Sequence, residues 1–219
     1  MILNFIGDLR GAEKMKNEDT SEHLIPPHGG YGKLVTYKLG LLIYDATVAF
    51  CEHYFDRKDR TFDQMVQAAR SGVANIVEGS EASAASKKTE LKLTNVAKAS
   101  QEELLEDYRS FLRQRKLPMW DAQSVHAQTV REARPENLMQ LRQLMACLVS
   151  DLSDKSDQSD KNAVKQEVAA NTMICLFNQE TFLLARQISR LAEDFEKNGG
   201  FTERLYRIRS EKRKQHGEK

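Results

Sequence analysis

The chain has 219 residues, of which 30% are charged and 7% aromatic, with 11 glycines and 4 prolines. The scarcity of helix breakers and the abundance of Ala, Leu, Glu, Lys, Gln and Arg favour an all-α protein. Three cysteines, far apart and among apolar neighbours, indicate buried thiols in a reducing compartment and exclude a disulfide scaffold. The apolar runs are shorter than the ~20 residues that cross a bilayer, and the apolar start lacks a secretory signal pattern. We therefore expect a soluble cytoplasmic protein.

Charge is unevenly distributed along the chain, although its formal net value is only +1. Residues 201–219 contain 7 Lys and Arg against 3 Asp and Glu, whereas residues 121–160 contain 4 against 7. Residues 83–120 contain 8 against 5. A nearly neutral chain can therefore still carry a local surface that binds anions.

The first 30 residues are predicted to be a flexible leader and an entry turn. Residues 1–25 lack hydrophobic periodicity, and residues 26–31 are rich in Pro and Gly. Gly32-Lys33 resembles a phosphate-binding loop only superficially, because Pro27 and Leu34 stand where that loop needs Gly and Ser or Thr. We expect a turn that leads into a helix.

Three amphipathic helices follow. The first is predicted over residues 33–55, with an apolar stripe at spacings of three and four. The second begins with a capping box of Thr61 and Gln64 and ends at Gly79, a residue suited to a left-handed helix terminus. The third covers residues 87–116, with Ser86 as its N-cap. The expected stripe of the first helix is Leu34, Tyr37, Leu41, Tyr44, Val48, Cys51 and Phe55.

Residues 118–161 are predicted to be an insertion before the last long helix. After a less regular stretch, Arg134-Pro135 starts a short helix. Residues 150–161 repeat Ser-Asp every three residues, which favours a flexible acidic linker over a calcium loop because the EF-hand ligand spacing is missing. The last long helix covers residues 162–197, with its apolar face at Met173, Phe177, Thr181, Leu184, Ile188, Leu191 and Phe195.

The predicted fold is thus all-α: an antiparallel four-helix bundle over residues 31–200 with an insertion before the fourth helix. Asn198-Gly199-Gly200 stops the fourth helix, and residues 201–219 form a short basic C-terminal helical extension.

Two motifs in the second and third helices carry a family resemblance. The first comprises Arg70, Ser71, Asn75, Ile76, Glu78 and Gly79, and the second Ala97, Ser100, Glu103 and Leu104. They resemble the bacterial four-helix-bundle family of the ribosomal RNA intervening-sequence protein, which is related to accessory variability proteins of retroelements. The segments HGGY, YDAT, KKTELKLTNVAKAS and GGFTERLYRIRS are similar to the branch with a C-terminal "suffix". Val77 departs from this pattern, since many relatives have Ala there.

The resemblance implies a left-handed bundle that assembles into a homo-oligomer, a ring of five in relatives, and it implies no reaction. For the retroelement relatives it implies a basic adaptor that binds nucleic acid and a reverse transcriptase. We therefore expect a non-enzymatic adaptor that binds RNA or DNA through basic patches. The expected contact residues are Lys87, Lys88, Lys92, Arg109, Arg113, Arg115, Lys116, Arg204, Arg207, Arg209, Lys212, Arg213 and Lys214.

The alternative hypothesis is a protein–protein scaffold without nucleic-acid binding. Packing and assembly are then the roles of the shared motif residues, with Asn75 and Glu78 capping the turn after the second helix or bonding a neighbouring subunit. The motif residues concerned are Arg70, Ser71, Asn75, Glu78, Gly79, Ser100 and Glu103.

A helical-bundle ribonuclease is a weaker hypothesis. Arg209 and His216 fit the loose Arg-x4-6-His spacing of such enzymes, but this spacing arises readily by chance in a basic tail. Neither Glu-x-x-His pairs nor Cys and His at zinc spacing occur. We therefore predict no catalytic residue, no metal and no cofactor.

Overall fold

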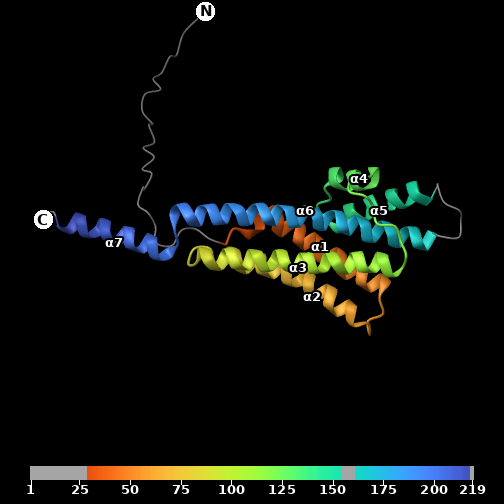
Figure 1. Cartoon of the computed structure of the whole chain (residues 1–219), viewed down its shortest axis with the longest axis horizontal. Helices are drawn as coiled ribbons and strands as arrows, with labels where there is room; N and C mark the ends of the chain where they lie inside the picture. Colours follow the sequence, from red (N-terminus) through yellow and green to blue (C-terminus); the bar gives the residue numbers. More distant parts are fainter. Residues whose placement is uncertain (1–28, 154–160, 218–219) are drawn as a thin grey trace, which may run out of the picture.

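The structure, a computed structural model, describes residues 29–153 and 161–217, and every regular element in these ranges is helical (Figure 1). The all-α prediction is confirmed. The expected leader and residues 154–160 of the Ser-Asp repeat lie outside the described ranges. The elements are η1 (Tyr31–Lys33), α1 (Val35–Tyr54), α2 (Arg60–Ala82), α3 (Lys87–Gln114), α4 (Val125–Ala133), α5 (Leu138–Ser153), α6 (Lys161–Asn198) and α7 (Phe201–Gly217).

The long helices form a bundle. α2 packs against α1 and α3, and α6 packs against α3 and α1. α4 and α5 cover one side of α6 near the start of that helix (Figure 1). α7 continues beyond the other end of the bundle (Figure 1). Each long helix therefore buries part of its apolar surface against its neighbours, as an amphipathic helix requires. Of the apolar face predicted for the last long helix, Met173, Phe177 and Leu184 are buried, and the other predicted residues are half-buried.

The ends of the helices agree only partly with the predictions. Ser86 caps α3 as expected, because its Oγ accepts a hydrogen bond of 3.1 Å from the backbone amide of Thr89. The capping box at Thr61 is wrong, since Asp59 is the N-cap of α2 and accepts a bond of 2.9 Å from the amide of Thr61.

Gly79 does not end its helix, because α2 continues to Ala82. It is buried against the start of α3, where a Cβ atom would lie 3.4 Å from the backbone oxygen of Glu90 and from Leu93 Cβ. A glycine in the sequence does not distinguish a left-handed helix terminus from a contact with another helix, so the sequence alone led to the wrong assignment.

The insertion is more regular than expected. α4 was missed, because it is short and only Ala127 and Val130 are buried on it. α5 begins at Leu138 and continues through Ser153, so the first residues of the Ser-Asp repeat, 150–153, are helical rather than linker. The remaining described residue of the repeat, Lys161, is the first residue of α6.

The buried face of α1 also differs from the predicted stripe. Leu41, which the spacing placed inside, is 39% exposed, whereas Gly40, Ile43 and Thr47 are buried. The spacing of large apolar residues suggested one face, but α1 packs on α2, α6 and α5 and buries a wider face that mixes small residues with Leu42, Ile43 and Phe50. Cys51 and Cys175 are buried as predicted, while Cys147 is exposed.

Two hydrophobic clusters fill the bundle. The larger includes the rings of Phe50, Tyr108, Phe111 and Phe177, and the centroids of neighbouring rings lie 4.6–5.3 Å apart. Among the described residues, the smaller cluster has only Ile76, Ala97 and Leu184 as its buried members, and it lies toward the end of the bundle that carries α7.

A polar layer separates the two clusters. Gln101 lies one turn from Ala97 on α3, and Glu180 lies one turn from Leu184 on α6. Both side chains are 0% exposed, and their polar side-chain atoms find no hydrogen-bond partner among the described residues. Glycines make room for them: a Cβ on Gly40 would lie 2.6 Å from Glu180 Oε1, and one on Gly72 would lie 2.2 Å from Gln101 Nε2.

Candidate nucleic-acid interface

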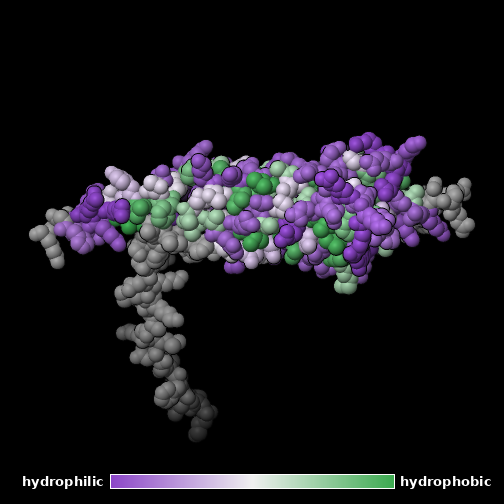
Figure 2. Space-filling model, turned by 90° about the horizontal axis from the view of Figure 1, so that it is seen from below, coloured by the Kyte–Doolittle hydropathy of each residue, from purple (hydrophilic) through white to green (hydrophobic). Residues whose placement is uncertain are grey.

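The most basic surface among the described residues is α7. This helix contains six Lys and Arg residues and two acidic residues, which gives it a net charge of +4. Its outer part is hydrophilic (Figure 2). α7 extends beyond the bundle (Figure 1), and its helical geometry distributes the charged side chains around the helix axis. The exposed cations are Arg207, Arg209, Lys212, Arg213 and Lys214, and Arg204 is half-buried.

Hydrogen bonds stabilise the junction between α6 and α7. Gly199 has the left-handed φ of 68° that ends α6, and its amide donates to the carbonyl of Phe195 at 2.9 Å. Glu203 Oε2 accepts a bond of 2.8 Å from the amide of Gly200. The backbone amide of Glu203 itself and, second, that bond from Gly200 lower the pKa of this carboxyl. Arg207 donates to the carbonyl of Asn198 at 3.1 Å, so this cation also stabilises the junction.

The start of α3 lies beside this junction. Lys87 Nζ lies 3.3 Å from Asp194 Oδ2 near the end of α6 and 3.4 Å from Glu90 Oε2. A hydrogen bond from Asn198 lowers the pKa of Asp194, and Lys87 acts in the same direction. Lys87 thus joins two helices, whereas its neighbours Lys88 and Lys92 are exposed. The structure brings Lys88 and Lys92 to the same end of the molecule as α7.

The basic residues at the other end of α3 are not part of that surface. Lys88 and Lys116 are separated by about 40 Å along the chain direction at 1.5 Å per residue. Arg109 Nη1 and Arg113 Nη1 lie 3.4 Å and 3.7 Å from the carboxylate oxygens of Glu106, so their charge is partly neutralised. Lys116 is exposed and has a left-handed φ of 54°.

Arg115 has a structural contact that its place in a basic run conceals. Its guanidinium carbon lies 3.8 Å from the ring centroid of Phe111 and 5.5 Å from that of Phe55. It also donates to the carbonyl of Tyr54 at 3.3 Å. Burial lowers the pKa of Arg115. This side chain therefore ties the end of α3 to the end of α1.

The shared motif residues lie mainly where α2 meets α3. The hydroxyls of Ser71 and Ser100 lie 3.1 Å apart across the two helices. Asn75 Nδ2 donates to the carbonyl of Ser71 at 2.8 Å, so its amide bonds within α2 rather than at the turn after it. Three charged members of the motif, Arg70, Glu78 and Glu103, are exposed.

The Arg209 and His216 pair lies on one face of α7, two turns apart, which separates their backbones by about 10 Å. His216 Nδ1 lies 2.9 Å from the carbonyl oxygen of Lys212. Within one chain, this ring nitrogen is therefore directed at its own helix rather than at Arg209.

Within residues 29–153 and 161–217, no group of three or more His, Cys, Asp or Glu side chains could hold a metal ion. In the same ranges, no helix is long and apolar enough to cross a membrane.

Sequence reasoning missed the buried polar layer. Glu180 is adjacent to Thr181, which the apolar spacing placed inside, and its charge alone favours an exposed position. Burial raises its pKa to about 8. A signal for this site was present in the glycines, because Gly40 and Gly72 interrupt helices whose other buried positions are mostly larger.

Comparisons of the chain with family models, with curated proteins and with solved structures find no match in any of the three. The resemblance to the ribosomal RNA intervening-sequence family therefore stays a prediction.

Proposed function

We propose that the chain is a non-enzymatic, homo-oligomeric adaptor that binds RNA or DNA through α7 and the start of α3. α1, α2, α3 and α6 are the four antiparallel helices of its bundle, and α4 and α5 are the insertion before the fourth. The observation that carries the proposal is the helix of net charge +4 beyond the packed core. Phosphates bind such a surface largely without regard to sequence.

The location of the cations refines the expected contact surface. Lys88 and Lys92 lie at the end that carries α7, and Lys87 connects α3 to α6 there. Arg109 and Arg113 lie at the far end beside Glu106. We assign nucleic-acid contact to the first group and to α7, and not to the second. A ring of several copies would repeat this basic surface and multiply the number of phosphate contacts.

The salt dependence of binding tests this proposal. A labelled single-stranded oligonucleotide, as RNA or as DNA, is titrated with the protein between about 50 mM and about 200 mM salt. We expect the affinity to fall steeply with salt. The variant Arg209→Gln/Arg213→Gln/Lys214→Gln should reduce the slope of log K against log[salt] by about 2, since each lost phosphate contact to a single strand contributes about 0.7.

Arg109→Gln/Arg113→Gln is the matched control, because it removes cations from the far end of α3 and should leave affinity and slope nearly unchanged. Absence of binding at about 50 mM salt would falsify the nucleic-acid role. An equal loss in the control variant would show that the far end contributes to the contact surface.

The scaffold hypothesis is the second candidate. It is favoured by exposed apolar side chains on the described surface, including Val35 at 63% and Phe182 at 61%. Native mass measurement of the full chain gives the number of subunits; five is the number that the resemblance implies. If the protein is a monomer and still binds the oligonucleotide, the adaptor role stands and the homo-oligomeric ring is excluded. A reverse transcriptase is the protein partner to test first, on the resemblance alone.

A further inference from the structure

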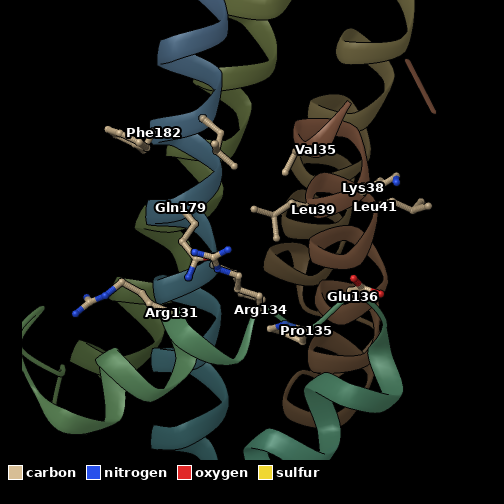
Figure 3. A pocket seen from close by; sticks show the side chains of 12 residues that line it. Val35, Lys38, Leu39, Leu41, Arg131, Arg134, Pro135, Glu136, Gln179 and Phe182 are labelled. Carbon is tan, nitrogen blue, oxygen red and sulfur yellow. The ribbon is translucent and has the colours of Figure 1, made fainter. Parts of the chain in front are cut away.

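A groove runs between α1 and α6, and the turn between α4 and α5 closes one of its ends (Figure 3). It encloses about 890 Å³, a size typical of sites for small molecules. Val35 and Leu39 of α1 line it together with Leu176 and Leu183 of α6. Leu183 and Leu39 are half-buried, and Val35 is 63% exposed. The walls therefore offer an apolar surface that a ligand could cover.

Several polar side chains that line the groove carry hydrogen-bond donors. Gln179 Nε2 is buried and finds no acceptor among the described residues. Arg134 extends from the α4–α5 turn into the gap between α6 and α1, toward Gln179 (Figure 3). Its backbone has a left-handed φ of 43°. Within residues 29–153 and 161–217, Arg134 takes part in no ion pair. The groove is thus lined by the buried amide donor of Gln179 and by the guanidinium of Arg134.

The charge around the groove has the same sign as these donors. Of the described residues, Lys38, Arg131 and Arg134 line the groove together with one acidic residue, Glu136. Arg131 already donates to the carbonyl of Ala122, and Lys38 is directed away from the gap (Figure 3). Arg134 is thus the cation in position to meet a ligand, and the others add a favourable field for an anion.

We propose that this groove binds an apolar carboxylic acid, whose carboxylate accepts hydrogen bonds from Arg134 and Gln179 and whose hydrocarbon part lies between the walls of α1 and α6. A carboxylate matches the planar fork of a guanidinium and can accept a third bond from an amide. The walls extend over about two helical turns, or about 11 Å, which suits a chain of medium length. This inference does not rest on the nucleic-acid role, since α7 does not line the groove.

Calorimetric titration of the full-length protein with decanoate tests the proposal, and 1-decanol is the neutral ligand of the same length. We expect decanoate to bind more tightly than decanol. Arg134→Gln should weaken decanoate binding about tenfold or more, as loss of a charge-assisted bond does. Arg142→Gln is the matched control, because Arg142 is exposed on α5 and does not line the groove.

A second variant, Gln179→Leu, keeps the apolar wall and removes the buried donor. It should weaken decanoate binding and leave decanol binding equal or tighter, while circular dichroism confirms that each variant is folded. Equal affinities for decanoate and decanol would overturn the proposal, as would equal effects of Arg134→Gln and Arg142→Gln or a wild-type protein that binds neither ligand. If Leu39→Asp reduces an oligomer to single chains and decanoate does not bind the wild type, a second copy occupies the groove and the proposal fails.

Discussion

The two ends of the bundle are packed very differently. At one end, four aromatic rings from α1, α3 and α6 contact one another, and α4 and α5 add further cover. At the other end, the cluster has three buried members in the part of the chain that the structure describes, Ile76, Ala97 and Leu184, beside the half-buried Leu34 and Tyr37. Stability within one fold follows local burial. The end that carries the basic surface is therefore the less stable end.

The boundary between the two ends is itself unfavourable for stability. Glu180 and Gln101 are fully buried without hydrogen-bond partners among the described residues. Each unsatisfied buried polar group costs about 1–3 kcal/mol. A polar layer of this kind separates the clusters energetically as well as in space, and substitutions on its two sides should have different effects.

The largest difference is expected between alanine substitutions in the two clusters. Phe177→Ala removes a ring that is 0% exposed and lies 5.3 Å from the ring of Tyr108, so it should lower the free energy of unfolding by about 3–5 kcal/mol. Leu184→Ala should cost about 2 kcal/mol, the lower limit for such sites, because the thin cluster can relax. Denaturant unfolding measures both losses. Equal losses would contradict the comparison.

The Glu180→Gln variant tests the polar layer between the two ends through the pH dependence of the free energy of unfolding. Burial raises the pKa of Glu180 from 4.5 to about 8. Between these values the unfolded chain loses the proton and the folded chain keeps it, so the wild type loses stability as the pH rises, by up to about 1.4 kcal/mol per unit. The contribution of protonated Glu180 to the free energy of unfolding is fully present below pH 4.5 and is completely lost above about pH 8.

Glutamine does not titrate, so the free energy of unfolding of the variant should not show this loss. The difference between variant and wild type should therefore increase by about 3 kcal/mol from about pH 5 to about pH 7. Denaturant unfolding of both proteins across this range measures the difference. Parallel pH profiles would mean that Glu180 is ionised in the folded protein and that the polar layer is hydrated.

The smallest expected effect compares two buried glycines of α2. Gly72→Ala places a Cβ 2.2 Å from Gln101 Nε2 and 2.9 Å from its Cδ, which forces that side chain to move. After the gain in helix propensity, we expect a net loss of about 1–2 kcal/mol. Gly79→Ala meets its neighbours at 3.4 Å and should stabilise by about 0.5 kcal/mol. Thermal unfolding separates the two, and an equal effect would show that Gln101 moves without cost.

The sequence predicted the long helices well, because their apolar residues repeat at helical spacing. The fourth long helix was expected over residues 162–197, and α6 covers Lys161–Asn198. Ser86 was recognised because an N-cap is a local feature that depends on one side chain. These predictions use only neighbouring residues, which is the information that a single sequence contains.

What depends on contacts between helices could not be predicted. A glycine at a helix end and a glycine under another helix have the same sequence signal, so Gly79 was misplaced. A buried Glu180 requires Gly40 opposite, about 140 residues away in the chain. The basic run of α3 gave no sign that Arg115 stacks on Phe111.

The pairing of a large polar side chain with a glycine also fixes how far one helix can slide along another. An apolar stripe repeats about every turn, so on its own it would allow α6 to shift along α1 by one turn. Such a shift would place Phe177 or Leu184 against Gly40 and would move Glu180 among larger neighbours. The alignment of α6 along α1 is therefore set by the contact between Glu180 and Gly40. Since Gln179 precedes Glu180 in α6, the same contact sets the position of Gln179 relative to Arg134 in the groove.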